Sequence, residues 1–181
     1  MGRATSVARG IVAALDAADG VIALACRVVV ALTGAALLGI LAANVVARYV
    51  LARGGFSSAQ ELPEQLFPWF IAAGVVLAAR QGAHIAVDVL ARALPRAGRR
   101  VLLTLVHLLV AGAYLWLGLL ALEVAEIAAL QRTTILRLSG SYGYWALAAL
   151  AMLTAWTSLA IALRVLLAGP EAAPDPASEA A

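Results

Sequence analysis

Two histidines, His84 and His107, are the side chains of this sequence with the clearest capacity for chemistry. His84 follows an apolar run that ends near Ala79, and His107 lies inside the next apolar run. Neutral imidazoles are ligands of haem iron, and one from each of two helices would hold one haem b. A haem-binding electron-transfer subunit is therefore one alternative function. We favour a different interpretation of His107, as a satisfied polar side chain within a helix bundle.

His84 is also part of a regular polar pattern. Arg80, His84, Asp88 and Arg92 are each four residues apart. At about 100° per residue this spacing places them along one side of a helix, with apolar residues on the other sides. The pattern predicts an amphipathic helix over about 82–94 that lies at a membrane surface. Such a helix is an architectural element rather than an active site.

The sequence does not contain the residue patterns expected of an enzyme. Catalysis needs a nucleophile, a base and oxyanion-stabilising donors that converge, and none of the usual metalloprotease, hydrolase or phosphate-loop motifs occurs. The single cysteine, Cys26, excludes an internal disulfide and a multi-cysteine metal site. We therefore expect a protein that is not an enzyme, with no catalytic, cofactor-binding or metal-binding residues and no cofactor.

The composition indicates a membrane protein. Of the 181 residues, 64% are hydrophobic and only 13% are charged, whereas soluble domains are roughly 45–50% apolar and about 25% charged. The net charge of +3 comes from arginine, because the chain has no lysine. These arginines lie between apolar runs and form no continuous basic surface, so we expect the lipid bilayer and not nucleic acid as a partner.

The apolar runs predict an all-α membrane protein with four transmembrane helices plus one amphipathic interfacial helix after the second span. About 20 apolar residues cross a hydrocarbon core near 30 Å thick. The expected order is a cytoplasmic segment, a four-span membrane domain and a disordered cytoplasmic tail, at 1–20, 21–168 and 169–181. The spans are expected at about 28–46, 62–79, 101–122 and 142–163.

The arginines also predict the orientation of the chain. Nine lie on the side of the termini, at 3, 9, 27, 80, 92, 96, 99, 100 and 164, and four lie on the other side, at 48, 53, 132 and 137. Cytoplasmic loops carry the excess of positive charge, so both termini are expected in the cytoplasm. The middles of the four spans are almost purely apolar, whereas a substrate path needs polar groups or broken helices there. The sequence therefore favours a scaffold over a transporter that acts alone.

Several local features predict contacts at the helix ends. Asn44 and Arg48 share a helix face, where a hydrogen bond between them is plausible, and Ser58 with Glu61 has the form of a capping box. Pro68 is expected to kink the second span. Gly74 with Ala78 forms a pair of small residues that would let another helix approach closely.

The same region resembles a known family. The order and spacing of the residues between 44 and 88 is similar to that of the small membrane subunit of TRAP transporters, which are tripartite, ATP-independent periplasmic uptake systems. The residues that carry the resemblance are Asn44, Arg48, Tyr49, Glu61, Leu62, Trp69, Gly74, Arg80, Gly82, His84, Ile85 and Asp88. The chain departs from the family pattern at Ser57–Gln60, where a tryptophan and a first glutamate are common, and at Pro68.

The resemblance implies a role and partners. It implies a small, non-catalytic subunit in a bacterial inner membrane, which steadies a large membrane subunit that holds the substrate and sodium sites and moves as an elevator. It also implies a periplasmic binding protein, docked around 48–64 and 126–141, and import of small organic anions, mostly carboxylates. Candidate interface or structural residues are Asn44, Arg48, Glu61, Trp69, Gly74, Arg80, His84 and Asp88. A free-standing structural or regulatory membrane protein is a further alternative.

Overall fold

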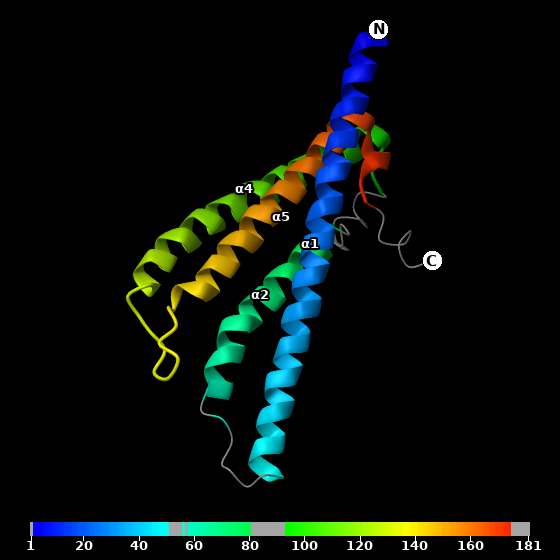
Figure 1. Ribbon diagram of the computed structural model, residues 1–181. Helices are drawn as coiled ribbons and strands as arrows, with labels where there is room; N and C mark the ends of the chain where they lie inside the picture. Colours follow the sequence, from blue (N-terminus) through cyan, green and yellow to red (C-terminus); the bar gives the residue numbers. More distant parts are fainter. Residues whose placement is uncertain (1, 51–55, 57, 81–92, 175–181) are drawn as a thin grey trace. The chain divides into compact units, whose positions relative to one another are not determined.

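The computed structural model describes residues 2–50, 56, 58–80 and 93–174, with side chains from Gly10 onward. Within these residues there are four long α-helices and one short 3-10 helix (Figure 1). They are α1 (Gly2–Tyr49), α2 (Ser58–Arg80), α4 (Arg96–Ala128), α5 (Ser141–Ala168) and η1 (Pro170–Ala172). All four α-helices are long and apolar enough to cross a membrane. The predicted all-α class with four membrane-spanning helices is confirmed.

The helices extend beyond the apolar spans predicted from the sequence. α2 has 23 residues and α4 has 33, which at 1.5 Å per residue gives roughly 35 and 50 Å. Helical hydrogen bonding therefore continues past the apolar residues into the polar flanks. The predicted interfacial helix, residues 82–94, lies outside the described residues except for its last two.

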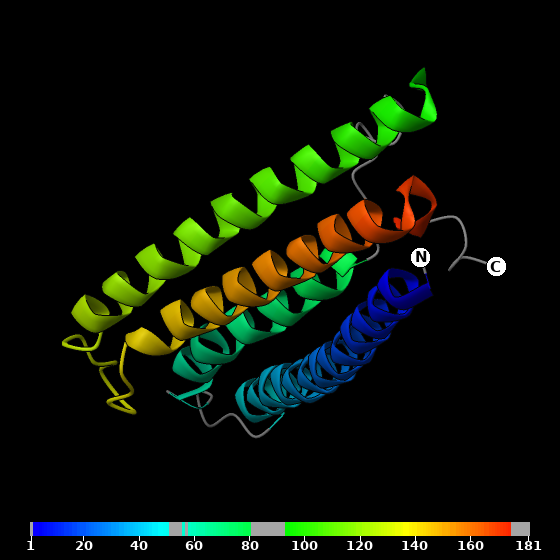
Figure 2. The same ribbon diagram turned by 90° about the horizontal axis from the view of Figure 1, so that it is seen from above.

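The chain forms two compact units, to which each long helix contributes. The first comprises residues 1–24, 76–116 and 152–181, and the second comprises residues 25–75 and 117–151. In the first unit α4 and α5 lie side by side (Figure 2). Leu103 of α4 packs there with Ile161 and Val165 of α5, and Leu102 and Ala173 lie against this cluster.

In the second unit, glycines allow close contacts between helices. A side chain at Gly34 of α1 would place its Cβ 3.1 Å from the Phe70 ring of α2. At Gly143 of α5 a Cβ would lie 3.5 Å from Pro68 Cγ. Pro68, expected to kink its span, lies within the continuous helix α2 and takes part in this contact. Gly74 has open space at its Cβ position, so the close helix approach predicted there is not made within the described chain.

α5 is the most buried of the four helices. Of its apolar stretch 56% is buried, against at most 17% for the other three. Its buried residues include Thr154, Thr157 and Ser158 among alanines, and Thr157 Oγ1 donates to Leu153 O at 2.8 Å. Small side chains of this kind let helices pack closely, and a hydroxyl can satisfy itself on its own helix. α5 therefore contributes more buried apolar residues to the described core of each unit than any other helix.

The chain turns sharply where α5 ends. Gly169 has φ 103° and ψ 173°, a conformation open essentially only to glycine. The 3-10 helix η1 follows directly, with Pro170 buried. The sequence predicted a disordered tail from residue 169, whereas the structure describes an ordered segment up to residue 174. The contacts of this segment with α4 are described below.

Candidate functional site

The α4–α5 loop (residues 129–140) is a short hairpin-like segment. Thr133 N donates to Leu138 O at 2.9 Å, and Gly140 N donates to Gln131 O at 3.0 Å. Arg137, at the tip, has a positive φ of 52°. A Cβ at Gly140 would lie 3.0 Å from the backbone oxygen of Ala128. Glycine is thus required where the loop passes close to the end of α4.

Glu61 of α2 holds this loop in place. Its two carboxylate oxygens accept hydrogen bonds from Ile135 N and Leu136 N, each at 2.8 Å, and the residue is buried. Bonds from amides to an ionised carboxylate are stronger than those between neutral groups. The capping box predicted for Ser58 and Glu61 is therefore wrong: α2 already begins at Ser58, and Glu61 satisfies the amides of a distant loop instead.

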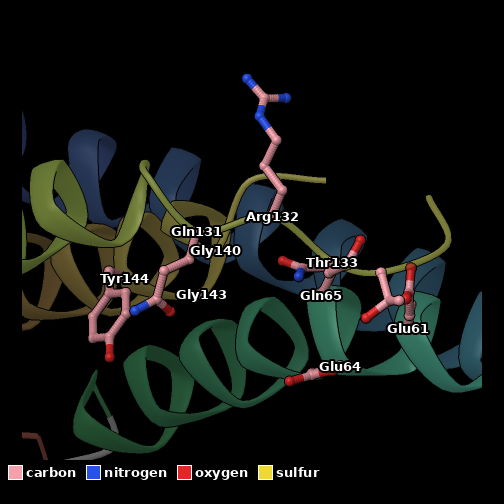
Figure 3. A pocket seen from close by; sticks show the side chains of 10 residues that line it. Glu61, Glu64, Gln65, Gln131, Arg132, Thr133, Gly140, Gly143 and Tyr144 are labelled. Carbon is pink, nitrogen blue, oxygen red and sulfur yellow. The ribbon is translucent and has the colours of Figure 1, made fainter. Parts of the chain in front are cut away.

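A polar pocket of about 430 Å³ lies between α2, the loop and the start of α5. We call it the loop pocket; it is lined by Glu61, Glu64, Gln65, Gln131, Arg132, Thr133, Thr134, Gly140, Gly143 and Tyr144. Figure 3 shows Glu61 and Glu64 on α2 and the Arg132 side chain extended away from the other labelled side chains. Carboxylates, amides and hydroxyls of this kind suit hydrogen bonding to a polar partner surface, and they form no catalytic constellation.

The end of α1 contributes Asn44 to the same unit. Asn44 Oδ1 accepts a hydrogen bond from Phe56 N at 2.9 Å. The Arg48 guanidinium carbon lies 5.9 Å from the centre of the Tyr49 ring, within the range of a cation–π contact. Asn44 thus contacts the backbone of Phe56, and the predicted hydrogen bond between Asn44 and Arg48 is not made. Asn44 joins the end of α1 to the residues that precede α2.

A buried charge cluster in the first unit was not predicted. Arg164 of α5 contacts Asp19 of α1 at 2.5 Å and Asp16 at 3.0 Å. The side chains of Arg164 and Asp19 are only 12% and 7% exposed, whereas that of Asp16 is 62% exposed. The sequence offered a signal, because Asp16 and Asp19 share a helix face in an otherwise apolar stretch. Ionisable groups at such positions usually pair with one another.

The remaining predicted residues are dispersed. Trp69 and Gly74 lie in α2 and are both half-buried. Arg80 is the last residue of that helix, and its Nε is buried and has no hydrogen-bond partner among the described residues. His84 and Asp88 lie outside the described residues. Glu61 is thus the predicted site residue that lines the loop pocket.

His107 is a buried residue of α4. Its Nδ1 lies 2.8 Å from Leu103 O, one turn earlier, and so donates a hydrogen bond to that carbonyl. This contact agrees with the interpretation of His107 as a satisfied polar side chain. Its partner in the haem alternative, His84, lies outside the described residues. No group of three or more potential metal ligands occurs in the part of the chain that the structure describes.

The C-terminal segment is attached to α4 by an ion pair. Arg96 Nε lies 3.0 Å from Glu171 Oε1, and Arg96 Nη2 donates to Glu171 Oε2 at 3.2 Å. A hydrogen bond from its own backbone amide lowers the pKa of the Glu171 carboxyl, partial desolvation opposes this, and Arg96 lowers the pKa further. Arg100 Nη2 donates to Leu166 O at the end of α5. Two arginines of α4 therefore hold the end of α5 and η1.

Four long apolar helices, with polar side chains gathered at their ends, define a multi-pass membrane protein. The family model of the DctQ component of tripartite ATP-independent periplasmic transporters matches residues 37–168. The chain belongs to this family of small membrane subunits of TRAP transporters, and the resemblance seen in the sequence is confirmed.

Two curated relatives are similar to parts of the chain. The "Uncharacterized protein y4mM" of Sinorhizobium fredii is 49% identical over 143 residues, which cover 79% of this chain and 26% of that protein. The "Putative TRAP transporter small permease protein" of Haemophilus influenzae is 28% identical over 103 residues, which cover 57% of this chain and 62% of that protein. The matched region thus spans about a quarter of the first relative and less than two thirds of the second.

Proposed function

We propose that this protein is the small, non-catalytic subunit of a sodium-coupled TRAP transporter that imports small organic anions, chiefly carboxylates. It would act as a scaffold for a large elevator subunit in a bacterial inner membrane, and it would help to dock a periplasmic substrate-binding protein. Family membership supports the transport role. Sodium coupling and substrate sites would reside in the large subunit, because the four described helices expose mostly aliphatic side chains between their polar ends.

One structural observation carries the scaffold role. Trp116 of α4 is 74% exposed and Trp156 of α5 is 44% exposed, and both lie near the middle of their helices. Tryptophan normally lies at the membrane–water interface, where its N–H meets water or headgroups. At mid-helix the indole N–H needs an acceptor that lipid tails do not offer. A partner protein with polar groups at this depth would provide one.

The docking role is supported by the loop pocket. Glu61 fixes the backbone of the α4–α5 loop at Ile135 and Leu136, so that a polar surface is held in one conformation before any partner arrives. Preorganisation of this kind lowers the entropic cost of association. Under the predicted orientation this surface faces the periplasm.

The experiment is a mild-detergent pulldown of the tagged chain, co-expressed with the large subunit and followed by sodium-dependent uptake in vesicles with the binding protein. We expect Trp116→Leu to reduce the co-purified large subunit several-fold. Trp145→Leu is the matched control, because Trp145 is an exposed tryptophan of the first turns of α5. A chain that purifies without a large partner would contradict the proposal, as would equal recovery with both variants.

A further inference from the structure

A second pocket, unrelated to the loop pocket, lies in the first unit at the start of α4 and the end of α5. It has a volume of about 450 Å³. We call it the arginine pocket; it is lined by Arg96, Ala97, Arg100, Leu167, Ala168, Gly169 and Pro170. Its walls are thus two arginines one helical turn apart, facing small and apolar residues.

The two guanidinium groups retain donors for a ligand. A guanidinium has five N–H donors. Glu171 accepts from Nε and Nη2 of Arg96, and Leu166 O accepts from Nη2 of Arg100. These recorded bonds leave three N–H groups on Arg96 and four on Arg100. An oxyanion with several acceptor oxygens matches this set, and arginine binds phosphate with two parallel bonds.

The local charge also favours an anion. Three arginines of α4, Arg96, Arg99 and Arg100, and one carboxylate, Glu171, belong to this part of the described chain, and their formal charges sum to +2. The positive charges of Arg96 and Arg99 both lower the pKa of the Glu171 carboxyl. The last carbonyls of α5 carry partial negative charge, and Arg100 is bonded to one of them. Among the residues that the structure describes, Glu171 is the carboxylate recorded in contact with these arginines.

The surface beside the pocket is apolar. Val101 and Leu105, one turn apart on α4, are 59% and 60% exposed, and Leu166 and Leu167 of α5 are also exposed. The pocket lies where the apolar stretches of both helices end, which is the depth of lipid headgroups. A soluble anion would use the arginines alone, whereas a phospholipid would use the arginines and the aliphatic side chains together.

We propose that the arginine pocket binds the phosphate headgroup of an anionic phospholipid whose acyl chains lie along Val101 and Leu105. Basic pockets at the ends of membrane helices bind anionic headgroups by the same chemistry. The lipid would join the beginning of α4 to the end of α5, alongside the Arg96–Glu171 ion pair. This site is independent of the assignment to transport.

The test is lipid retention by the full-length chain. The protein is delipidated in mild detergent, incubated with equal amounts of phosphatidylglycerol and phosphatidylethanolamine, and examined by native mass spectrometry. We expect preferential retention of phosphatidylglycerol, and a loss of roughly fivefold in Arg100→Gln, the effect of one arginine near a membrane surface. Arg132→Gln, which removes one arginine from the α4–α5 loop, is the matched control and should retain the lipid. Equal retention by both variants would overturn the proposal.

Two further measurements keep the result interpretable. Glu171→Gln removes the carboxylate that competes with the lipid phosphate, so this variant should retain more phosphatidylglycerol than the unchanged chain. This gain can be measured even if Arg100→Gln fails to fold. Unchanged or lower retention in Glu171→Gln counts against the site. Inorganic phosphate at millimolar concentration and fixed ionic strength should not displace the lipid, because phosphate lacks acyl chains. Displacement would show a soluble-anion site and would overturn the phospholipid assignment.

Discussion

At the scale of residues, charged side chains fix contacts between separate segments in the described part of the chain. Glu61 binds two loop amides, Arg164 binds two aspartates, and Arg96 binds Glu171. Each contact joins segments far apart in the sequence. Ordinary membrane helices gain little from the hydrophobic effect between them, so polar contacts and close packing carry more of their specificity.

The Glu61 contact predicts a local effect on the α4–α5 loop. Glutamine in place of Glu61 removes the negative charge. It also places an amide NH₂, which cannot accept a hydrogen bond, opposite one of the two backbone N–H groups of Ile135 and Leu136. We expect Glu61→Gln to speed hydrogen exchange at the Ile135 and Leu136 amides by roughly tenfold or more, as for loss of a bond to a charged acceptor. Glu64→Gln, in the same pocket on the exposed side of α2, is the control. Exchange that is unchanged in Glu61→Gln would contradict the assigned contact.

The buried charge cluster predicts a large effect on global stability. Removing one partner of a buried ion pair leaves an uncompensated charge and costs about 3–5 kcal/mol. Arg164→Gln should therefore lower the thermal unfolding temperature in detergent markedly. Asp16→Asn should have a small effect, because Asp16 is 62% exposed. Similar unfolding temperatures for the two variants would show that Asp19 does not need its partner.

The C-terminal ion pair predicts a dependence on pH. The folded chain holds the pKa of Glu171 below its ordinary value of 4.5. The stability contributed is therefore fully present above pH 4.5 and is lost as the pH falls through the lower, folded value. Hydrogen exchange at Ala172 and Ala173 should accelerate as the pH drops through this range, after correction for intrinsic rates. The effect should disappear in Glu171→Gln.

At the scale of elements, helices that meet through glycine are sensitive to added volume. A Cβ added at Gly34 would lie 3.1 Å from the Phe70 ring, whereas one added at Gly39, on the same helix, would meet open space. We expect Gly34→Leu to destabilise the fold by about 1–3 kcal/mol, since overpacking forces a side chain or a backbone to shift. Gly39→Leu should have little effect and is the control. Unfolding in denaturant-supplemented detergent compares the two, and equal stability would contradict a close α1–α2 contact.

The helices themselves were predictable, and their contacts were less so. Long apolar runs bounded by arginine, glutamate or glycine predict α1, α2, α4 and α5 because length and hydropathy are local properties. Glu61 was identified as a candidate residue, yet its partners at Ile135 and Leu136 lie over 70 residues away. A capping box is a local pattern, and the tertiary contact replaced it.

Pairing between helices was missed for a similar reason. The sequence does not indicate that Arg164 pairs with Asp16 and Asp19, because sequence spacing does not show which helices are neighbours. Gly34 and Gly143, where helices approach closely, are not distinguished by pattern from Gly74, where the described chain leaves open space. Small residues are common in this sequence, so their spacing alone does not select a contact.

At the scale of the whole molecule, the arginine distribution predicts one orientation in the membrane. Green fluorescent protein fused after Ala181 should fluoresce, since it folds in the cytoplasm. Alkaline phosphatase inserted after Thr134, in the α4–α5 loop, should be active, since it folds in the periplasm. The opposite pattern would place the loop pocket in the cytoplasm and would remove the docking role proposed for it.

The ion pair between Arg164 and Asp19 also has a consequence for biosynthesis. The two residues are 145 positions apart, so a ribosome working at about 5–20 residues per second makes Asp19 roughly 7–29 s before its partner. During that interval the carboxylate of α1 has no counter-charge from α5. A chain cut short before Arg164 leaves the Asp19 carboxylate without this counter-charge, and we therefore expect it to be less stable than the complete chain.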